Sequence, residues 1–482
     1  MSSSIPGATF RDLLWLSFAS ASCAVAGTLL WRLFLHPLRK VPGPILAATT
    51  GWYTAYFDLL KDGGFVEHLE ELHRIYGAVI RIGPNELHFN DPKAFLAIYS
   101  NSSTFTKDYY FYRCFQQDES SFGMTNFLEA KARRELLLPM FSRRAILRLE
   151  DVIREKVDEL VCQLASYSSS HAVDMTLAFR ALTLDIIMAY CFGHCDDTIK
   201  APEFRHPFLL AQATRAPVCW LFRHIPISKF LIQASPRRWL RAEPQAFESV
   251  RDRIAAQVDE VIADQAALED LGRRTIFSHL LIHSQINENG KALSNSLSRT
   301  SLLQEACNLV SAGVDTTANT CTVGLFMILH NTDVHRKLIE ELCEAWPAPQ
   351  QSMPYEKIEK LPYLTAVIKE SLRISNSVVT PLPRVVGPQS ATILGVCVPA
   401  GTTVSMGQPF LHFNSDIFES PEAFMPERWM GEHLGELDSY LAPFSRGPRS
   451  CPATNLAWCE LYMSFATIIR KLHLKVYETT RL

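Results

Sequence analysis

The sequence predicts a mainly α-helical fold with a small β subdomain, in which one large domain with a long central helix follows a single transmembrane helix. Three observations predict it. Through most of the 482 residues, apolar and charged positions alternate at the spacings of three and four that are typical of helices. Only a few short segments carry strand patterns. No internal repeat or low-complexity linker divides the chain, so one large domain fits better than the three that its length alone suggests.

The composition excludes several classes of protein. Hydrophobic residues make up 48% of the chain and charged residues 20%, with a formal net charge of −3. A chain of this length buries roughly three quarters of its unfolded surface, so a large core forms and intrinsic disorder is excluded. The near-neutral charge argues against nucleic acid as a partner. Twelve cysteines are too sparse for a disulfide scaffold, and most are expected to be small core residues.

The N-terminal residues carry the pattern of a membrane anchor. From Leu13 to Trp31, 19 residues lack a formal charge, and a helix of that length nearly spans a hydrocarbon core of about 30 Å. A cleaved signal peptide is the alternative, since Ala24-Val25-Ala26 resembles a cleavage site. Basic residues after the segment favour the anchor and, by the positive-inside rule, a cytosolic position for the rest of the chain. They are Arg32, Arg39 and Lys40.

We therefore divide the chain into four parts. They are an N-terminal tail (1–12), a transmembrane anchor (13–35), a proline-rich tether (36–44) and a globular domain (45–482). Three prolines lie in the tether, and each fixes the backbone angle φ and removes a hydrogen-bond donor. We expect this segment to be a stiff, non-helical connection between the membrane and the globular domain.

Within the globular domain, helical spacing predicts six main helices. They are Phe65 to Tyr76, Leu149 to Ala165, Phe179 to Tyr190, Ala242 to Ala267, Leu302 to His330 and Leu361 to Ile374. Strand patterns are fewer: Ala78 to Ile82 and Glu86 to Phe89, which flank the turn Gly83-Pro84-Asn85, then Ala391 to Val398 and Thr402 to Ser405. Two polar segments are predicted as loops: Ser284 to Ser301 and Ala345 to Pro354.

One cysteine lies in a setting that favours chemistry. Cys451, in APFSRGPRSCPATNLAWCEL, comes just before an amphipathic helical pattern. The positive end of a helix dipole and its free N–H groups lower a thiol pKa, and a thiolate is a metal ligand or a nucleophile. Gly447 permits the turn that a flat cofactor requires, while Arg446 and Arg449 supply positive charge for anionic groups. A buried structural cysteine is the alternative.

Two further motifs lie upstream. The long helix from Leu302 to His330 contains the run Ser311-Ala312-Gly313-Val314-Asp315-Thr316-Thr317. It is either a solvent-facing turn whose hydroxyls bond back to i−4 carbonyls, or a widened turn that holds water beside a proton-delivering acid and alcohol. Glu370 and Arg373 place opposite charges three residues apart on another helix, a pair that any surface helix can contain.

Taken in order, five motifs resemble the cytochrome P450 superfamily. The resemblance runs from about Val41 to the C-terminus. The early segments KVPGP and YGAVIRIGPNELHF are similar to filamentous-fungal members that tailor secondary metabolites, terpenoids in particular. The five motifs are AGVDTT (Ala312 to Thr317), ESLR (Glu370 to Arg373), PLPR (Pro381 to Arg384), PERW (Pro426 to Trp429) and FSRGPRSC (Phe444 to Cys451).

The resemblance implies a site for haem b. Cys451 matches the axial thiolate ligand of the haem iron, with Phe444 packed beside it. Arg449 and Arg384 match residues that pair with the haem propionates. Arg134, in FLEAKARRELLLPMFS, matches another basic residue at the propionates. Its neighbour Arg133 could serve instead, and a solvated basic helix face is the alternative for both.

The resemblance also implies roles for two other groups of residues. Glu370, Arg373 and Arg428 match a buried triad that positions the loop carrying the haem ligand, which is a structural role. Asp315 and Thr316 match the acid–alcohol pair that relays protons to dioxygen in an apolar pocket.

Three positions depart from the superfamily's pattern. Ala453 stands where a glycine is usual, and Ala130 stands where tryptophan or histidine is usual. Pro452 directly follows the ligand and has no N–H to donate to the sulfur. Our hypothesis is that Pro452 leaves a more electron-rich thiolate and a lower haem reduction potential.

The sequence thus predicts a haem-dependent monooxygenase of the endoplasmic reticulum membrane, single-pass, with its catalytic domain in the cytosol. Its substrate would be an apolar small molecule, a terpenoid or another fungal intermediate, and O2 the oxidant. No flavin or dinucleotide motif is present, so electrons from NADPH would come through a separate reductase, docked on a basic face around Arg446 and Arg449. A haem-thiolate isomerase or dehydratase that uses no O2 and a non-catalytic haem-binding protein are the alternatives.

An aromatic run, Asp108 to Tyr112 with Phe115 and Phe122, lines the substrate pocket or is plain packing.

Overall fold

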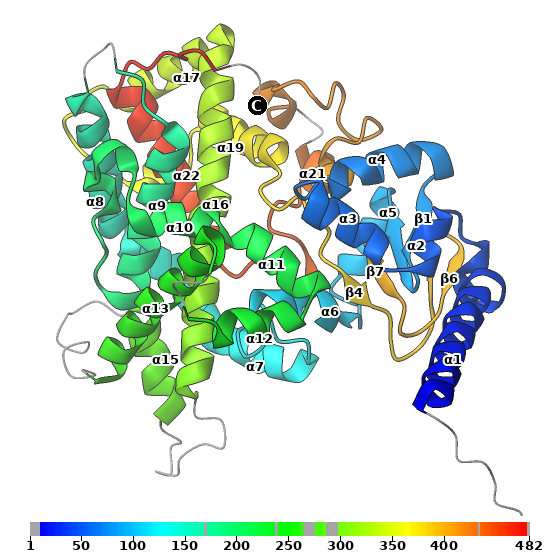
Figure 1. Cartoon of the computed structure of the whole chain (residues 1–482). Coiled ribbons are helices and arrows are strands. Elements are labelled where there is room, and N and C mark those ends of the chain that lie inside the picture. Colours follow the sequence, from blue (N-terminus) through cyan, green and yellow to red (C-terminus); the bar gives the residue numbers. More distant parts are fainter. Residues whose placement is uncertain are drawn as a thin grey trace, which may run out of the picture.

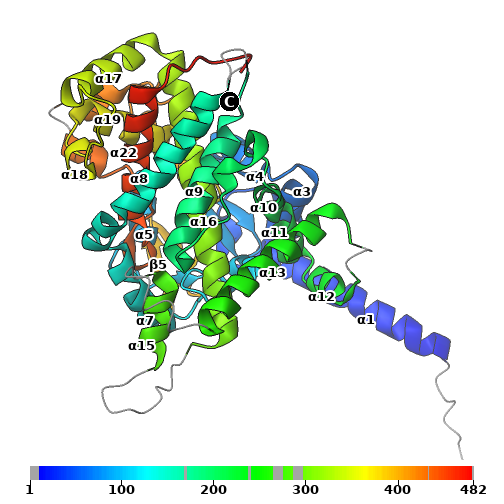
Figure 2. The ribbon, with the colours of Figure 1, turned by 90° about the vertical axis from the view of Figure 1, so that its left-hand side faces the viewer.

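A helix of 32 residues, α16 (Arg299–His330), forms the axis of the helical part of the protein (Figure 1). The Ser298 side chain caps its first turn by accepting a hydrogen bond from the Ser301 N–H. Helices α9 (Met175–Phe192), α19 (Pro362–Ser375) and α22 (Thr454–Lys471) pack directly on this axis (Figures 1 and 2). Helix α8 (Arg143–Ser166) packs on α9 and α22.

The computed structural model describes residues 10–167, 171–236, 240–263, 275–285, 297–431 and 434–479. Besides these and the N-terminal helix, the described chain contains α2 (Ile45–Thr49), α3 (Trp52–Leu60), α4 (Phe65–Tyr76), α5 (Pro92–Tyr99), α6 (Tyr109–Tyr112), α7 (Phe127–Leu137), α10 (Pro207–Ala213), α11 (Arg215–His224), α12 (Ile227–Ala234), α13 (Ala242–Ala263), α15 (Ile276–Gln285), α17 (Thr332–Ala345), α18 (Tyr355–Ile358), α20 (Pro409–His412) and α21 (Leu434–Asp438). The prediction of a mainly helical fold is confirmed.

The predicted helices are present, and three of the six, α8, α9 and α16, begin earlier than their apolar spacing indicates. Helix α8 begins at Arg143 because Ser142 caps it, and α9 begins at Met175 because the Asp174 carboxylate accepts from two N–H groups. Of the predicted helix from Ala242 to Ala267, the last four residues lie outside the described chain. The predicted loop from Ser284 to Ser301 is helical at both ends, and its residues 286–296 are likewise outside the described chain.

A five-stranded sheet forms the smaller part of the fold, on the right of Figure 1, with strand order β1-β2-β7-β4-β3. The predicted hairpin is confirmed as antiparallel β1 and β2, and β7 pairs with β2 in parallel. The predicted strand from Ala391 to Val398 is wrong: it is a hairpin of two strands, because Gly395 adopts a φ of 75° that permits a tight turn. The strands are β1 (Val79–Gly83), β2 (Glu86–Phe89), β3 (Thr106–Lys107), β4 (Arg384–Val385), β5 (Ala391–Ile393), β6 (Val396–Val398) and β7 (Thr403–Ser405).

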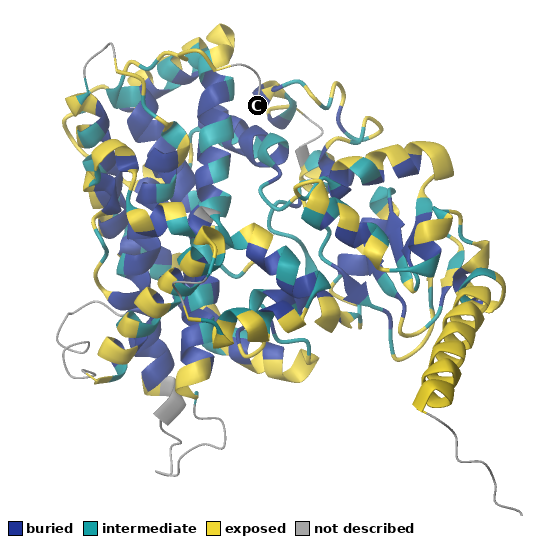
Figure 3. Ribbon diagram, in the orientation of Figure 1, coloured by how far each residue is buried: buried dark blue, intermediate teal, exposed yellow. Residues whose placement is uncertain are grey.

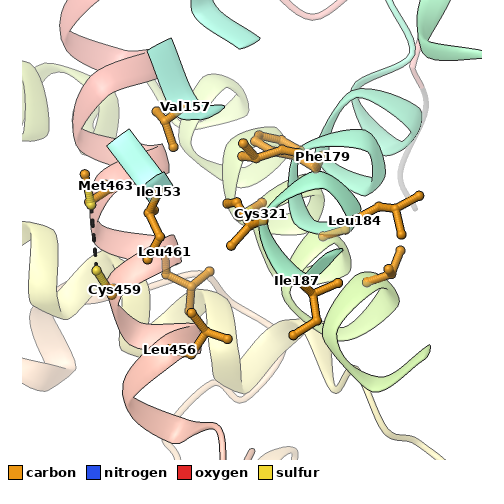
Figure 4. Close-up of a cluster of buried hydrophobic side chains, with 14 of the residues drawn as sticks. Ile153, Val157, Phe179, Leu184, Ile187, Cys321, Leu456, Cys459, Leu461 and Met463 are labelled. Atoms are coloured by element: carbon orange, nitrogen blue, oxygen red, sulfur yellow. Dashed lines mark hydrogen bonds between the residues drawn. The ribbon is translucent and has the colours of Figure 1, made fainter. Parts of the chain in front are cut away.

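Two apolar cores hold these parts together (Figure 3). The larger joins α8, α9, α16 and α22, and Figure 4 shows Ile153, Phe179, Cys321 and Leu461 pointing into it from those four helices. The smaller core lies between the sheet and helices α4 and α5. The larger core borders the cavity described below, since Ile187 belongs to this cluster and also lines that cavity.

The N-terminal helix α1 (Phe10–Leu30) projects from the body and is exposed along its whole length (Figure 3). With a final π-type turn at Trp31–Leu35, it is apolar and long enough to cross a membrane. The helix begins three residues before the predicted anchor. Helix α9 has a similar length and hydropathy, but it is mostly buried in the protein core.

We expected the segment 36–44 to be non-helical, but part of it forms a helical turn. Pro37–Lys40 forms a 3-10 turn, which the His36 side chain caps. Leu38 is buried against the smaller core, and the Pro42 carbonyl accepts a hydrogen bond from the Arg81 N–H at 2.7 Å. This segment therefore packs on the sheet and fixes where the N-terminal helix leaves the body.

Buried histidines predict how stability depends on pH. His412 Nδ1 donates to Asn376 Oδ1, its Nε2 accepts from the Ala442 N–H, and burial lowers its pKa to about 3. His73 and His88 share a hydrogen bond of 2.7 Å, and burial lowers both pKa values. An unfolded histidine binds its proton near pH 6.5, so the unfolded state takes up more protons below that pH. The free energy of unfolding is therefore expected to fall from about pH 6.5 downwards.

We expect each of these histidines to contribute up to about 1.4 kcal/mol per pH unit. Urea unfolding at pH 7.5 and pH 5.0 measures the loss, and His412→Gln should reduce the slope by one histidine's share. A His412→Gln variant with the slope of the wild type would contradict this explanation.

Candidate active site

A cavity lies where α16, α19 and the loop before α22 meet, and Cys451 lines it. The Cys451 N–H donates to the Phe444 carbonyl at 2.8 Å, which closes the loop between them. Gly447 in this loop has a φ of 74°, and a side chain there would lie 2.5 Å from the Tyr99 carbonyl oxygen. Glycine is therefore required both for the backbone conformation and for this close approach.

The Cys451 side chain is exposed to the cavity, and the cavity lies inside the protein. Burial raises the pKa of this thiol, and a hydrogen bond from the Ala453 N–H and the charge of Arg134 only partly oppose that effect. The predicted lowering of the thiol pKa by the helix start is thus wrong for the protein alone, because desolvation outweighs the local donors.

Four cationic side chains line the same cavity: Lys107, Arg134, Arg384 and Arg449. Within the described chain none of them pairs with a carboxylate. Lys107 and Arg449 donate to the Phe122 carbonyl at 2.6 and 3.3 Å, and Arg384 donates to the Tyr112 hydroxyl at 2.9 Å. Burial and the neighbouring cations lower the pKa of Lys107, and they lower that of Arg449 to about 10.

Lys107 was not predicted. Strand β3 consists of only two residues and has no alternation to mark it, and the pairing of Lys107 with Arg384 across β3 and β4 is visible only in the structure. The Lys107 ammonium also lies 4.0 Å from the centre of the Phe122 ring, which stabilises a buried cation by a cation–π interaction.

The two neighbouring arginines of α7 face different ways. Arg133 is buried and forms an ion pair of 3.2 Å with Glu305. Arg134 lines the cavity, with no hydrogen bond or ion pair to any described residue, and the Cys451 thiol is among the groups that perturb its pKa. Arg134 is thus the residue of the two that can meet an anion bound in the cavity.

This lining fits a flat, apolar molecule with two acidic groups and a soft metal centre. Its lining combines four cations without a carboxylate partner among the described residues, one thiol, and leucine, phenylalanine and alanine side chains. Glu460 is the carboxyl that lines the cavity, and burial raises its pKa to about 8, so it is neutral at pH 7. Thiolate is a ligand of haem iron, and guanidinium groups bind carboxylates.

Glu370, Arg373 and Arg428 are in contact. Arg373 forms two hydrogen bonds to the Glu370 carboxylate, at 2.8 and 2.9 Å, and Arg428 adds a third at 3.1 Å. Glu370 and Arg373 are completely buried. Arg373 also donates to the carbonyls of His412 and Pro421, so it ties α19 to the segment that precedes the Cys451 loop.

Asp315 and Thr316 follow one another on α16 but face different surroundings. Thr316 lines the cavity, and its hydroxyl donates to the Ala312 carbonyl at 2.8 Å. Asp315 does not line the cavity. It forms an ion pair of 2.8 Å with Arg180, and about half of its side chain is exposed. The helix is continuous here, and the Ser311 hydroxyl also donates to an i−4 carbonyl. Of the two alternatives for this turn, these hydrogen bonds fit the one with hydroxyls bonded back to the helix rather than the widened turn.

The protein-family model for cytochrome P450 matches residues 49–482. The chain belongs to the cytochrome P450 family. It is similar to the cytochrome P450 monooxygenases pbrB of Penicillium brasilianum (30% identical, 98% of this chain and 93% of the relative covered) and macH of Penicillium terrestre (33%, with 97% and 93% covered). It is also similar to the tryptophan 6-hydroxylase fscE of Fusarium equiseti (32%, with 93% and 88% covered).

Membership of the cytochrome P450 family makes the chain a monooxygenase-type oxidoreductase with a haem-thiolate cofactor.

Two expectations, one about a docking surface and one about the lining of the pocket, change with the structure. Arg449 faces the cavity and the Ser121 carbonyl rather than a docking surface. Arg446 donates to the Ser439 carbonyl in an exposed hydrogen bond, and a docking face around Arg446 stays a prediction. Of the aromatic run with Phe115 and Phe122, only Phe122 lines the cavity, because the other side chains pack in the core or face outward.

Pro452 offers a test of how this cytochrome P450 tunes its cofactor. The Ala453 N–H donates to the Cys451 sulfur, and Pro452 has no N–H that could add a second hydrogen bond. Such hydrogen bonds withdraw electron density from a ligating sulfur. Pro452→Ile is therefore expected to raise the haem reduction potential, measured by spectroelectrochemical titration. An unchanged potential would rule out the hypothesis.

Proposed function

We propose that this protein inserts one oxygen atom from O2 into an apolar small molecule, with electrons from NADPH supplied through a separate reductase. The observation that carries the proposal is one cavity lined by a thiol and by four cations, none of which pairs with a carboxylate in the part of the chain that the structure describes. When bound there, haem supplies the activation of dioxygen. The residues of the chain hold that cofactor, exclude water and move protons.

Each candidate residue has a role in this proposal. Cys451 ligates the iron, with Phe444 against its loop. Arg134, Arg384, Arg449 and, in addition, Lys107 hold the two carboxylates of haem b. Glu370, Arg373 and Arg428 fix the position of the loop before Cys451. Thr316 presents a hydroxyl inside the cavity, and Asp315, half exposed beside Arg180, connects that hydroxyl to protons from solvent.

The substrate in this proposal is predominantly apolar. Besides the cations, the cavity is lined by apolar residues, among them Phe122, Leu309, Ala312, Val378 and Leu382, and apolar surface is buried favourably against such residues. The similarity to fungal cytochrome P450 monooxygenases supports a secondary-metabolite intermediate, such as a terpenoid. An accumulated precursor in a deletion strain would identify the substrate.

Exposed apolar side chains support a position on the endoplasmic reticulum membrane, with the catalytic domain in the cytosol. Besides α1, large apolar residues are exposed on α2 and on α12, the latter on the lower side of the molecule, as α1 is, in Figure 1. They are Ile45, Leu46, Ile227, Phe230 and Leu231, all more than 60% exposed. Exposed apolar patches of this kind mark membrane or protein contacts.

A reduced, carbon-monoxide-bound absorption spectrum tests the proposal. The wild type is expected to give the red-shifted band of a thiolate-ligated haem, and Cys451→Ala is expected to lose that band. Cys459→Ala is a matched control, because Cys459 lies on the next helix and is buried in the core. A wild type without the band would refute the proposal.

Labelled dioxygen separates oxygen insertion from an isomerase or dehydratase reaction. With NADPH and a reductase, one labelled oxygen atom should enter the product. A product that forms equally well without oxygen would refute the monooxygenase assignment while leaving the haem site intact.

A further inference from the structure

A buried polar cluster lies beside the cavity, about three helical turns before Thr316. Its centre is Glu305 on α16, whose side chain is completely buried. Four donors approach the carboxylate. Glu305 Oε2 accepts from the Ser121 N–H at 2.7 Å and from Arg133 at 3.2 Å. Glu305 Oε1 accepts from the Ser121 hydroxyl at 2.7 Å and from Asn308 at 2.9 Å.

This arrangement fixes the orientation of the Asn308 amide. A carboxylate only accepts hydrogen bonds, so the Asn308 NH2 group must face Glu305. The same NH2 group donates to the Ser121 hydroxyl at 3.3 Å. Asn308 Oδ1 then points the other way and receives no hydrogen bond from any described residue. Asn308 is 8% exposed and lines the cavity, so this oxygen is an acceptor without a donor at an apolar surface.

We propose that Asn308 is a specificity-determining residue whose Oδ1 accepts a hydrogen bond from a hydroxyl group of the substrate. The inference rests on the proposed function, because it concerns the substrate of that cavity. Eight residues separate Asn308 from Thr316, which corresponds to about 12 Å along the helix. The hydroxyl group of the substrate would therefore bind about 12 Å along α16 from Thr316, the residue to which the proposed function gives the hydroxyl used in proton delivery.

The charges of the cluster exclude other polar groups. Glu305 is neutralised by Arg133 and has four donors, so it offers nothing to a substrate ammonium group, and burying an unpaired ammonium group is strongly unfavourable. A substrate carboxylate would face an amide oxygen that also only accepts. The site therefore fits a neutral hydrogen-bond donor on the substrate. A substrate without such a donor leaves Asn308 Oδ1 without a hydrogen bond.

The test uses the full-length, haem-loaded protein in detergent and two isomeric probes, 1-decanol and 1-methoxynonane. They have the same atoms, but only the alcohol has an O–H donor. Dissociation constants come from the change in haem absorbance on titration. One neutral hydrogen bond corresponds to up to about tenfold in affinity. The alcohol preference is the dissociation constant of the ether divided by that of the alcohol. We expect this ratio to be about tenfold smaller in Asn308→Leu than in the wild type, and to fall to a similar extent in Asn308→Ala.

Asn319→Leu is the matched control, because Asn319 is on the same helix but does not line the cavity and bonds to the Ser375 carbonyl. It should keep the preference of the wild type. The same preference in Asn308→Leu and Asn308→Ala as in the wild type, or binding of neither isomer, would overturn the inference. If the wild type lacks the red-shifted carbon monoxide band, the proposed function fails instead, so the two failures are distinguishable.

Discussion

Arg373→Met is expected to lower the free energy of unfolding by about 3–5 kcal/mol, because it leaves a buried carboxylate without its main partner. Arg373 supplies two of the hydrogen bonds to Glu370 and also satisfies the carbonyls of His412, Pro421 and Ala423. In the variant, Arg428 is the one cation left beside Glu370 among the described residues, together with two neutral donors, the Met425 N–H and the Trp429 indole N–H. The urea midpoint, followed by far-ultraviolet circular dichroism, measures the loss.

Arg336→Met is the matched control for this substitution. Arg336 also pairs with two carboxylates, Asp333 and Glu340, but about half of its side chain is exposed. Exposed ion pairs contribute roughly 0–1 kcal/mol, so the midpoint should barely move. Equal losses in the two variants would show that the buried triad does not stabilise the segment before the Cys451 loop.

Asp315→Asn is expected to lower kcat by at least about 100-fold if Asp315 delivers protons, since general acid–base catalysis contributes roughly 10²–10⁴-fold. The amide keeps the shape of the side chain but cannot release a proton. Because Asp315 does not line the cavity, its replacement should leave substrate affinity unchanged. Product formation with the substrate found by metabolite profiling, together with the dissociation constant of that substrate, separates the two effects.

Asp196→Asn is the control, because Asp196 is another carboxylate that binds an arginine, Arg253, across two elements of the helical part. Turnover of this variant should match the wild type. An Asp315→Asn enzyme with the kcat of the wild type would remove Asp315 from the proton route and leave Thr316 without a partner acid.

The main helices and the first hairpin could be predicted because the spacing of apolar residues differs between helices and strands and indicates which face is buried. The helix from Phe65 to Tyr76 and the hairpin around Pro84 were predicted correctly from that signal. Helix starts were less accurate, because Ser142 and Asp174 act through side-chain hydrogen bonds that leave no apolar period. The order of the five strands depends on pairings across 300 residues, which spacing cannot reveal.

The candidate site was predictable where a motif carries the chemistry and less so where the chemistry depends on burial. Cys451, Arg384 and Arg449 lie around one cavity, as their motifs implied. The direction of the Cys451 pKa shift was wrong, because desolvation depends on the whole surrounding structure. Lys107 carries no motif. Glu305 is one of two acids in an apolar helix, and the four donors to its carboxylate come from three different segments.

The divergence of Arg133 and Arg134 limits how this protein can evolve. Successive helical residues point about 100° apart, so α7 sends one arginine to the polar cluster at Glu305 and the next to the anion side of the cavity. Insertion or deletion of one residue within α7 would rotate both guanidinium groups out of place together. New substrate preferences are therefore more accessible through point substitutions at positions such as Asn308 than through length changes in this helix.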